Sequence, residues 1–419
     1  MATVATRRSQ AGASSLASKS RGLTCDKTAV VVGTGVVGLA TALGCAQRGL
    51  HVKLVGAAPR ACSAAAARGE ASEADASFDS RIYALSQGAR ELLQALKVWS
   101  QVDAERICAV ERMRVFGDEG GRLQFDAYSA GVERLATICE ERQLLRALWL
   151  GCSMVPDIEH FAQDFDSVTF EAGAAHVRLT DGTKIQCAAL LGADGKRSSV
   201  RAACGIGAQV TSYGHTAFVA NFSCERPHHG TAYQWFTEEG IVALLPLPGE
   251  LVSLVWSAPD ALAPELAASP AAEFAERVAR RAGLVVGSLQ MVGEKRAFAL
   301  DRVVVDRLVR PNVALLGDAA HVVHPLAGQG LNLGLQDVSE FLRLLAAREP
   351  WRGLGDEVWL RRYARARAEP IALMRGTVGG LARLFASQDA AVRRLRNVGM
   401  SAVNALAPVK SALIRHATG

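Results

Sequence analysis

The stretch that decides the fold is residues 29–55, AVVVGTGVVGLATALGCAQRGLHVKLV. Its β-branched start predicts a strand at 29–33, the following residues predict a helix at 36–48, and 51–55 predicts a second strand. The turn between the first strand and the helix holds three glycines, Gly33, Gly35 and Gly38. Such glycines allow a tight turn, backbone approach to a pyrophosphate at the helix N-terminus, and close helix–strand packing. The pattern therefore predicts a βαβ unit that binds a dinucleotide, the alternative being a tight turn without a ligand.

The same region has one ambiguity and one defect. Residues 28–47 carry no charge, a length that would also suit a membrane-spanning helix, but the glycines and the run 30–32 favour strand, turn and helix. We expect no spanning helix. The second strand runs into Gly56, where an acid that hydrogen-bonds the adenosine ribose is expected. A charged hydrogen bond stabilises by roughly 1.5–3 kcal/mol, so its loss is expected to weaken cofactor binding roughly ten- to hundredfold.

Two further motifs follow later in the chain. Residues 192–201, GADGKRSSVR, place Asp194 and Gly195 in a turn after an apolar strand, which alone is a common arrangement. The strongest motif joins VALLGDAAH at 313–321 to HPLAGQGLNLG at 324–334. A buried strand there brings Asp318 to the carboxyl edge of a sheet, where ligands of such sheets bind. The glycines that follow allow backbone amides at a helix N-terminus to approach a flat ring and to stabilise negative charge on it.

These three motifs, in this order and spacing, resemble the para-hydroxybenzoate-hydroxylase class of flavoprotein monooxygenases. Within that class the chain is most similar to the ubiquinone-biosynthesis hydroxylases. The resemblance covers roughly residues 28–419 and includes local matches at 78–86, 140–149 and 227–236. It implies an α/β fold, with a Rossmann-like FAD-binding domain, a smaller mixed-sheet α+β substrate domain and a helical C-terminus. The predicted ranges are 28–205 with 296–345 for the discontinuous FAD-binding domain, 206–295 for the substrate domain, 346–419 for the C-terminal helical region and 1–27 for a flexible tail or targeting segment.

The resemblance also implies which residues bind the cofactor. The three glycines of the first motif would bind the FAD pyrophosphate, and Arg142 would lie near the cofactor. Arg81, in the matching stretch 78–86, is included with them. Asp194 and Gly195 would help to form the FAD and NAD(P)H region.

The third motif would hold the flavin end. Its predicted cofactor-binding residues are Gly317, Asp318, Pro325, Gly328, Gly330 and Asn332. Asp318 would bind the ribityl chain, and Pro325, Gly330 and Asn332 would line the isoalloxazine ring.

The resemblance implies a monooxygenase that hydroxylates a lipid-linked phenol, such as a prenylated ubiquinone precursor, with dioxygen. NAD(P)H is the expected reductant, although another donor would serve, and no catalytic side chain is named. Two departures keep other hypotheses open. Gly56 replaces the ribose acid, and Glu141 stands where Asn or Gln usually contacts the flavin. One alternative is a hydroxylase of a soluble aromatic; another is a non-catalytic homologue that joins a ubiquinone-biosynthesis complex.

Charge is unevenly distributed along the chain. From Arg361 to the end, eleven Lys/Arg stand against two acids, a balance of +9, so the rest of the chain sums to −3 for a total of +6. A basic C-terminus suits an anionic membrane surface or an acidic partner, the alternative being a solvated helical face. No recognition motif suggests nucleic acid. The expected location is cytoplasmic, with peripheral attachment to the inner membrane left open, or the mitochondrial matrix if the N-terminal segment is a transit peptide; a homo-oligomer is also left open.

Cysteines and histidines give little sign of metal chemistry. The nine cysteines are scattered without a CxxC pair, which is typical of a reducing compartment without a disulfide framework or a zinc site. His321 and His324 flank the third motif, but no third ligand stands at metal spacing, so no metal site is expected. A hydrogen-bonded core histidine is the simpler interpretation of His321.

Overall fold

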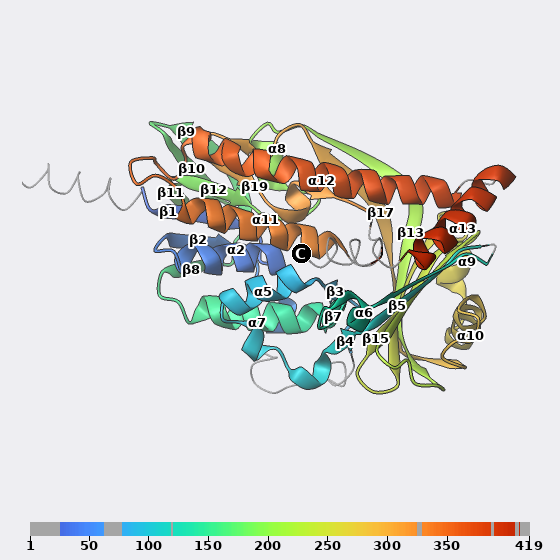
Figure 1. Cartoon of the computed structure of the whole chain (residues 1–419). Helices are drawn as coiled ribbons and strands as arrows, with labels where there is room; N and C mark the ends of the chain where they lie inside the picture. The colour runs from blue at the N-terminus through green and yellow to red at the C-terminus, as the bar shows by residue number, and fades with distance from the viewer. Residues whose placement is uncertain are drawn as a thin grey trace, which may run out of the picture.

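The computed structural model describes residues 26–62, 78–118, 120–324, 329–386, 389–406 and 410. The chain forms a layered α/β part around β1 and a second part around a large sheet, and the long strands β13 and β17 run between them (Figure 1). Most of the predicted N-terminal segment 1–27 lies outside the described residues, and so do Pro325 and Gly328 of the third motif.

The layered part is built on a mainly parallel sheet. β1 (Thr28–Val32) lies inside a six-stranded sheet of order β18-β19-β12-β1-β2-β8. It pairs in parallel with β2 (His51–Val55) and with β12 (Ala189–Gly192), and α2 (Val36–Ala46) connects β1 to β2. The other strands are β8 (Ile158–Phe161), β18 (Val309–Arg310) and β19 (Val313–Leu315). The predicted βαβ unit is therefore confirmed.

Both faces of this sheet are covered, which explains why β1 is apolar throughout. Ala29 and Val31 pack into the helical layer, whereas Val30 and Val32 pack against a three-stranded antiparallel sheet. The helices are α2, α5 (Gln87–Ala95), α7 (Glu141–Ser153) and α11 (Gln329–Ala346). The small sheet consists of β9 (Phe165–Glu171), β10 (Ala174–Leu179) and β11 (Lys184–Cys187).

The second part is an eight-stranded sheet of order β20-β17-β13-β16-β15-β14-β5-β6. Its longest strands are β13 (Ala208–Cys224) and β17 (Leu289–Val305). The others are β5 (Arg112–Phe116), β6 (Arg122–Asp126), β14 (Thr231–Thr237), β15 (Gly240–Leu247), β16 (Leu251–Pro259) and β20 (His321–Val322). On one face, α9 (Ala263–Ala268) and α10 (Ala271–Arg281) cover the apolar core.

Local structure departs from the sequence pattern in two places. The spacing of Leu, Ala and Ile in residues 81–96 predicts one helix, which is wrong for the first part. Residues 82–85 form strand β3 (Ile82–Leu85), which pairs with β7 (Ala136–Glu140), and α5 begins only at Gln87. Ser86 starts that helix because its hydroxyl caps the backbone N–H of Ala89. In addition, β5 and β6 join the large sheet although their sequence was assigned to the FAD-binding range, since β5 pairs in parallel with β14, which is distant in sequence.

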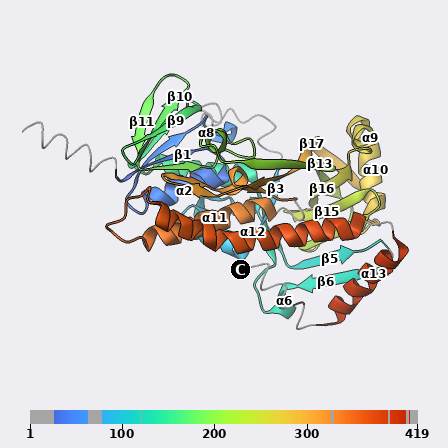
Figure 2. The same ribbon diagram turned by 90° about the horizontal axis from the view of Figure 1, so that it is seen from above.

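The helical C-terminus joins the two parts. α12 (Glu357–Ala386) runs from the layered part to the large sheet, and α13 (Ala390–Ala405) lies beyond it beside β6 (Figure 2). Near its start, the hydroxyl of Tyr363 donates to the carbonyl of Leu315 at 3.0 Å. Near its end, Phe385 stacks on Phe236 with ring centroids 3.7 Å apart. No helix within the described ranges is long and apolar enough to span a bilayer.

Candidate active site

The β1–α2 turn is shaped by its glycines. A Cβ atom on Gly33 would lie 2.2 Å from the carbonyl oxygen of Ala193, and one on Gly38 would lie 1.9 Å from the oxygen of Gly33. Gly33 also has φ +118°, a conformation that other residues rarely adopt. At Gly35 a Cβ would meet nothing within 4 Å, and no side chain caps the start of α2. The open helix N-terminus can therefore receive a phosphate on its backbone N–H groups.

The second motif lies directly beside this turn. The backbone N–H of Ala193 donates to the carbonyl of Val32 at 2.8 Å, so Asp194 follows at the carboxyl edge of the sheet. One oxygen of Asp194 accepts from the backbone N–H of Val200 at 3.1 Å. The other oxygen is buried and has no hydrogen-bond partner in the described part of the chain. A buried carboxylate oxygen without a partner is costly, so this atom is suited to a donor from a ligand.

The third motif completes the same edge. Gly317 has φ +59°, and a Cβ there would lie 3.1 Å from the Val37 side chain in α2. Asp318 follows Gly317 at the same edge of the sheet. Burial of its carboxyl group raises the pKa of Asp318, and the charges of His321 and Arg81 oppose that rise. The structure thus places Asp318 within electrostatic reach of Arg81, far away in the sequence.

Arg81 and Glu141 form one wall of the site. The Arg81 guanidinium lies 3.2 Å from a Glu141 carboxylate oxygen and 5.1 Å from the centroid of the Phe298 ring. The hydroxyl of Tyr83 donates to the same carboxylate at 2.9 Å. Burial and the Glu141 charge raise the pKa of Tyr83 well above its ordinary value, so this hydroxyl remains protonated. Glu141, a departure from the family pattern, is therefore held by two neighbours.

The guanidinium of Arg142 pairs with a different carboxylate, that of Glu140. Its guanidinium lies 3.0 Å from Glu140, whose carboxylate is fully buried and also binds Arg106 at 2.6 Å and the backbone N–H of Asp79 at 2.6 Å. This network fixes the start of α7, and with it Glu141, beside the site. The sequence placed Arg142 near the cofactor; its observed contact supports a positioning role.

The start of α11 is anchored by Asn332. Its side chain accepts from the backbone N–H of Ser86 at 3.0 Å and donates to the carbonyl of Ala84 at 2.8 Å. A Cβ on Gly330 would meet nothing within 4 Å, so the first turn of α11 leaves open space beside its backbone.

His321 is a hydrogen-bonded core histidine. Its Nε2 lies 2.6 Å from Asp337, which also accepts from Arg367 at 2.6 Å and from the backbone N–H of Gly317 at 2.9 Å. All three side chains are buried. The network holds Gly317 in place without facing the cavity described below. Among the described residues, no group of His, Cys, Asp and Glu is arranged to hold a metal ion.

The end of β2 lacks the usual acid, as the sequence indicated. Gly56 has φ +132°, and its carbonyl oxygen contacts Nε2 of His160 at 2.8 Å. Thr34, from the glycine turn, donates its hydroxyl to the carbonyl of Ala57 at 2.6 Å. The ribose end of the site is thus made of backbone and one threonine. The pyrophosphate and flavin ends fit FAD, because they offer an open helix N-terminus, an unpartnered carboxylate oxygen and Asp318.

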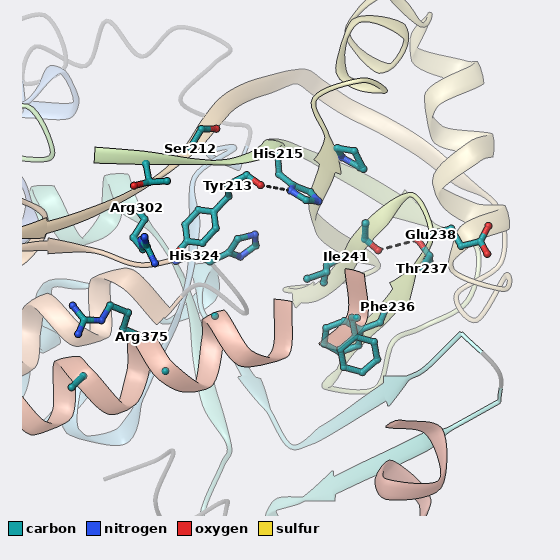
Figure 3. Close-up of a pocket in the computed structure, with 17 residues that line it drawn as sticks. Ser212, Tyr213, His215, Phe236, Thr237, Glu238, Ile241, Arg302, His324 and Arg375 are labelled. Atoms are coloured by element: carbon teal, nitrogen blue, oxygen red, sulfur yellow. Dashed lines mark hydrogen bonds between the residues drawn. The ribbon is translucent and has the colours of Figure 1, made fainter. Parts of the chain in front are cut away.

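A cavity of about 680 Å³ lies between the large sheet and α12. His324, the first residue of the segment HPLAGQGLNLG in the third motif, lines this cavity. Figure 3 shows Tyr213, His215 and His324 in its middle. The three sequence motifs include His324, whereas the other lining residues lie outside them. The remaining labelled side chains are Ser212, Arg302, Phe236, Thr237, Glu238, Ile241 and Arg375.

The histidine at the centre of this cavity is neutral. Nε2 of His324 lies 3.1 Å from the Ser257 hydroxyl, its ring meets Tyr213 edge to face, and its Nδ1 is buried without a partner in the described residues. Burial, and then the neighbouring His215, lower the pKa of His324 to about 4. A neutral imidazole with an unpartnered nitrogen can accept or donate one hydrogen bond, according to its tautomer.

Known proteins resemble this chain over nearly its whole length. Residues 26–374 match the FAD binding domain family. The chain is 33% identical to ubiquinone hydroxylase UbiL of Rhodospirillum rubrum, covering 94% of this chain and 90% of that protein. It is 30% identical to the 3-demethoxyubiquinol 3-hydroxylase of Escherichia coli, covering 93% and 97%. Among solved structures, the fold is similar to p-nitrophenol 4-monooxygenase PnpA of Pseudomonas putida, with TM-score 0.73, 16% identity and 94% and 99% coverage.

In the structure the three distant motifs meet at one sheet edge, and they lie within the residues that match the FAD binding domain family. The chain is an FAD-dependent monooxygenase with a Rossmann-like FAD domain. It belongs to the ubiquinone-biosynthesis hydroxylase family, within the para-hydroxybenzoate-hydroxylase class of flavoprotein monooxygenases.

Proposed function

We propose that this protein hydroxylates the aromatic ring of a lipid-linked phenol, a ubiquinone precursor. The observation that carries the proposal is the cavity between the large sheet and α12, which reaches His324 at the edge of the flavin motif. Phe236 and Ile241 also line it, and so does Phe385, which stacks on Phe236. An aromatic end suits a ring or a prenyl chain, and the relatives named above act on ubiquinone-type rings.

FAD would supply two-electron redox chemistry and the activation of dioxygen. The residues of this chain would bind the cofactor, orient the substrate and shield the site from water. The start of α2 would hold the pyrophosphate, Asp194 and Asp318 would accept hydrogen bonds from the cofactor, and Asn332 fixes the start of α11. The N-terminus of α11 would stabilise negative charge on the ring that it faces. His324 would exchange one hydrogen bond with the phenol through its unpartnered nitrogen.

NAD(P)H is the proposed reductant, and a prenylated phenol with dioxygen completes the substrates. The test is hydroxylation by the purified holoenzyme, with product mass measured for matched phenols with and without a prenyl chain. Faster reaction with the prenylated phenol is expected. Equal or faster reaction with the chain-free phenol would favour the soluble-aromatic alternative, and no hydroxylation of either would contradict the proposal.

We further propose that α13 attaches the protein to an anionic membrane surface. Its outward side exposes 70% of Leu395, 64% of Val398 and 53% of Leu406, beside the exposed Arg394. Basic and apolar groups on one helix suit a membrane interface. Much of the positive charge in residues 361–419 is paired within the protein and does not face the membrane. Five arginines there pair with carboxylates: Arg361, Arg362, Arg367, Arg393 and Arg396. A peripheral location on a membrane remains a proposal, as do a biosynthetic complex and a homo-oligomer.

Vesicle flotation tests this surface. Leu395→Glu with Val398→Glu is expected to reduce flotation with phosphatidylserine vesicles, whereas Leu150→Glu, an exposed leucine on α7, should not. Point variants are preferable to removing residues 361–419, because Tyr363 and Arg367 belong to the buried core. Unchanged flotation of the double variant would contradict the membrane proposal.

A further inference from the structure

One carboxylate holds α13 to the large sheet. Asp118, two residues after β5, accepts from the guanidiniums of Arg393 and Arg396, each at 3.1 Å, and from the side-chain amide of Asn397 at 2.9 Å. Partial burial acts to raise the pKa of Asp118, but hydrogen bonds from Arg396 and Asn397 lower it to about 2, so the carboxylate is charged at neutral pH. Arg396 and Asn397 are themselves buried. This cluster therefore anchors the first half of α13.

The two arginines of this cluster also contact the wall of the substrate cavity. Arg396 donates to the carbonyls of Leu384 at 2.6 Å and Phe385 at 3.2 Å in the last turn of α12, and its guanidinium lies 5.2 Å from the centroid of the Phe385 ring. Arg393 lies 3.5 Å from a carboxylate oxygen of Glu238. Phe385 and Glu238 both line the cavity. The position of α13 therefore fixes these two parts of the cavity wall.

Two further contacts of α13 cover the edge of β6. The side-chain oxygen of Asn397 accepts from the backbone N–H of Gly121 at 3.0 Å, and that of Asn404 accepts from the backbone N–H of Gln124 at 2.9 Å. Met400 adds a partly buried apolar contact. Water can replace hydrogen bonds of this kind at a small net cost. Detachment of α13 would therefore cost far less than unfolding the sheet, and it would expose these two N–H groups to solvent.

The opposite side of α13 favours a different surface. Leu395 and Val398 are exposed there (Figure 2 shows α13 at the outside of the molecule beside β6). An anionic lipid surface would bury these apolar side chains. Its phosphates would also offer Arg393 and Arg396 an alternative to Asp118, since guanidinium groups bind phosphate and carboxylate through the same charge-assisted hydrogen bonds. Such a surface therefore draws α13 away from the cluster both by apolar burial and by charge.

We propose that α13 is a latch on the substrate cavity. Bound through Asp118, it holds Phe385 and Glu238 in the cavity wall, and docking on an anionic lipid surface withdraws Arg393 and Arg396 and loosens that wall. Access to the cavity then increases where a lipid-linked substrate is present. This inference rests on the proposed hydroxylase function and on the proposed membrane surface of α13, and it names the regulation of the same site.

The test is hydrogen–deuterium exchange of the FAD-loaded full chain with vesicles of phosphatidylserine or of phosphatidylcholine. The reporters are the backbone N–H groups of Gly121 and Gln124, which α13 protects. Phosphatidylserine vesicles are expected to speed the exchange of these groups roughly fivefold or more, whereas phosphatidylcholine vesicles should not. The value of kcat/KM for hydroxylation of 2-prenylphenol should rise by a similar factor with phosphatidylserine only.

Two variants set the latch open or closed. Asp118→Asn removes the charge that holds both arginines and should give fast exchange and a high kcat/KM without vesicles. Asp166→Asn, at the exposed acid on β9, is the control and should behave as the wild type. Gly121→Cys with Asn397→Cys should lock the latch by a disulfide, because a Cβ on Gly121 would lie 3.2 Å from that of Asn397. The oxidised double variant should not respond to vesicles, and reduction should restore the response.

The outcomes separate the latch from the hydroxylase function. Faster exchange with phosphatidylserine that is absent from the oxidised double variant supports the latch, whether or not 2-prenylphenol is hydroxylated. Unchanged exchange in a wild type that floats with the vesicles overturns the latch, even if the phenol is hydroxylated. Equal responses of the oxidised double variant and the wild type overturn it as well, and a wild type that does not float overturns the lipid surface as its trigger. Absence of hydroxylation under every condition contradicts the proposed function alone.

Discussion

At the scale of single residues, Gly56 replaces the acid expected at the end of β2. Its φ of +132° means that a side chain is strained there even though the nearest atom to an added Cβ, in Thr34, is 3.4 Å away. The chain is therefore built around glycine at this position, and adding an acid does not simply restore the usual ribose contact.

Gly56→Glu is accordingly expected to lower the free energy of unfolding by about 1–2 kcal/mol. It should also fail to strengthen FAD binding. Urea unfolding and FAD titration measure the two effects, with Ala57→Glu, at the neighbouring exposed residue, as the control. A stable variant with tighter FAD binding would show that position 56 can accept the ribose acid.

His324 predicts a pH dependence of stability. Burial and His215 lower its pKa to about 4, below the ordinary value of about 6.5, so the unfolded chain takes up a proton more readily than the folded chain. The stabilisation is present above about pH 6.5 and is lost as the pH falls toward 4, with a slope of up to about 1.4 kcal/mol per pH unit. His324→Gln should flatten this part of the profile of unfolding free energy, whereas His176→Gln on β10 should not. Equal slopes for His324→Gln and the wild type would contradict a buried, neutral His324.

At the scale of elements, α12 forms a wall of the cavity with two glycines. Gly379 lines the cavity, and a Cβ there would meet nothing within 4 Å. Leucine at this position would extend into the cavity, and it also favours a helix by about 0.5–1 kcal/mol relative to glycine. Leucine at position 379 should therefore raise the stability of the protein and weaken ligand binding.

Gly379→Leu is expected to unfold at a slightly higher temperature and to bind a prenylated ligand roughly tenfold more weakly. Gly380→Leu is the matched control, because the next glycine on α12 also has free space around it but does not line the cavity. Thermal unfolding measures the stability, and calorimetry measures the affinity for the ligand. Undiminished affinity in Gly379→Leu would exclude this part of the cavity from the binding site.

Several elements could be predicted from the sequence because their signals are local. β1, α2 and β2 follow from a β-branched run, glycine spacing and a second apolar run, and the edge position of Asp318 follows from the strand before it. β3 was mistaken for helix because its identity depends on pairing with β7, which is distant in the sequence. The division of the chain into domains remains a prediction, although β5 and β6 belong to the large sheet.

At the scale of the whole molecule, the substrate cavity arises only from tertiary assembly. Tyr213 on β13, Arg302 on β17 and Arg375 on α12 come from three distant segments, and none belongs to a recognisable motif. Their presence in one cavity could not be predicted from their spacing in the sequence. The meeting of the three motifs at one sheet edge was predictable, because each motif carries its own pattern of glycine and acid next to a strand.

The C-terminal helices hold this assembly together. Arg367 on α12 binds the buried Asp337 of α11 at 2.6 Å, and Asn397 on α13 accepts from the backbone N–H of Gly121 at 3.0 Å. The cavity wall supplied by α12 is therefore fixed both to the flavin motif and to the large sheet. This arrangement allows one helix to align the substrate cavity with the cofactor.

The central claim is that this chain holds FAD at the edge formed by the three motifs, despite the missing ribose acid. The most direct measurement is the visible spectrum of the purified protein, with the released chromophore identified and quantified. The account predicts about one FAD per chain in the wild type and in Asp166→Ala, an exposed acid on β9, and a strong loss in Asp318→Ala. A colourless, folded wild type that cannot be reconstituted with FAD, or full FAD retention in Asp318→Ala, would contradict it.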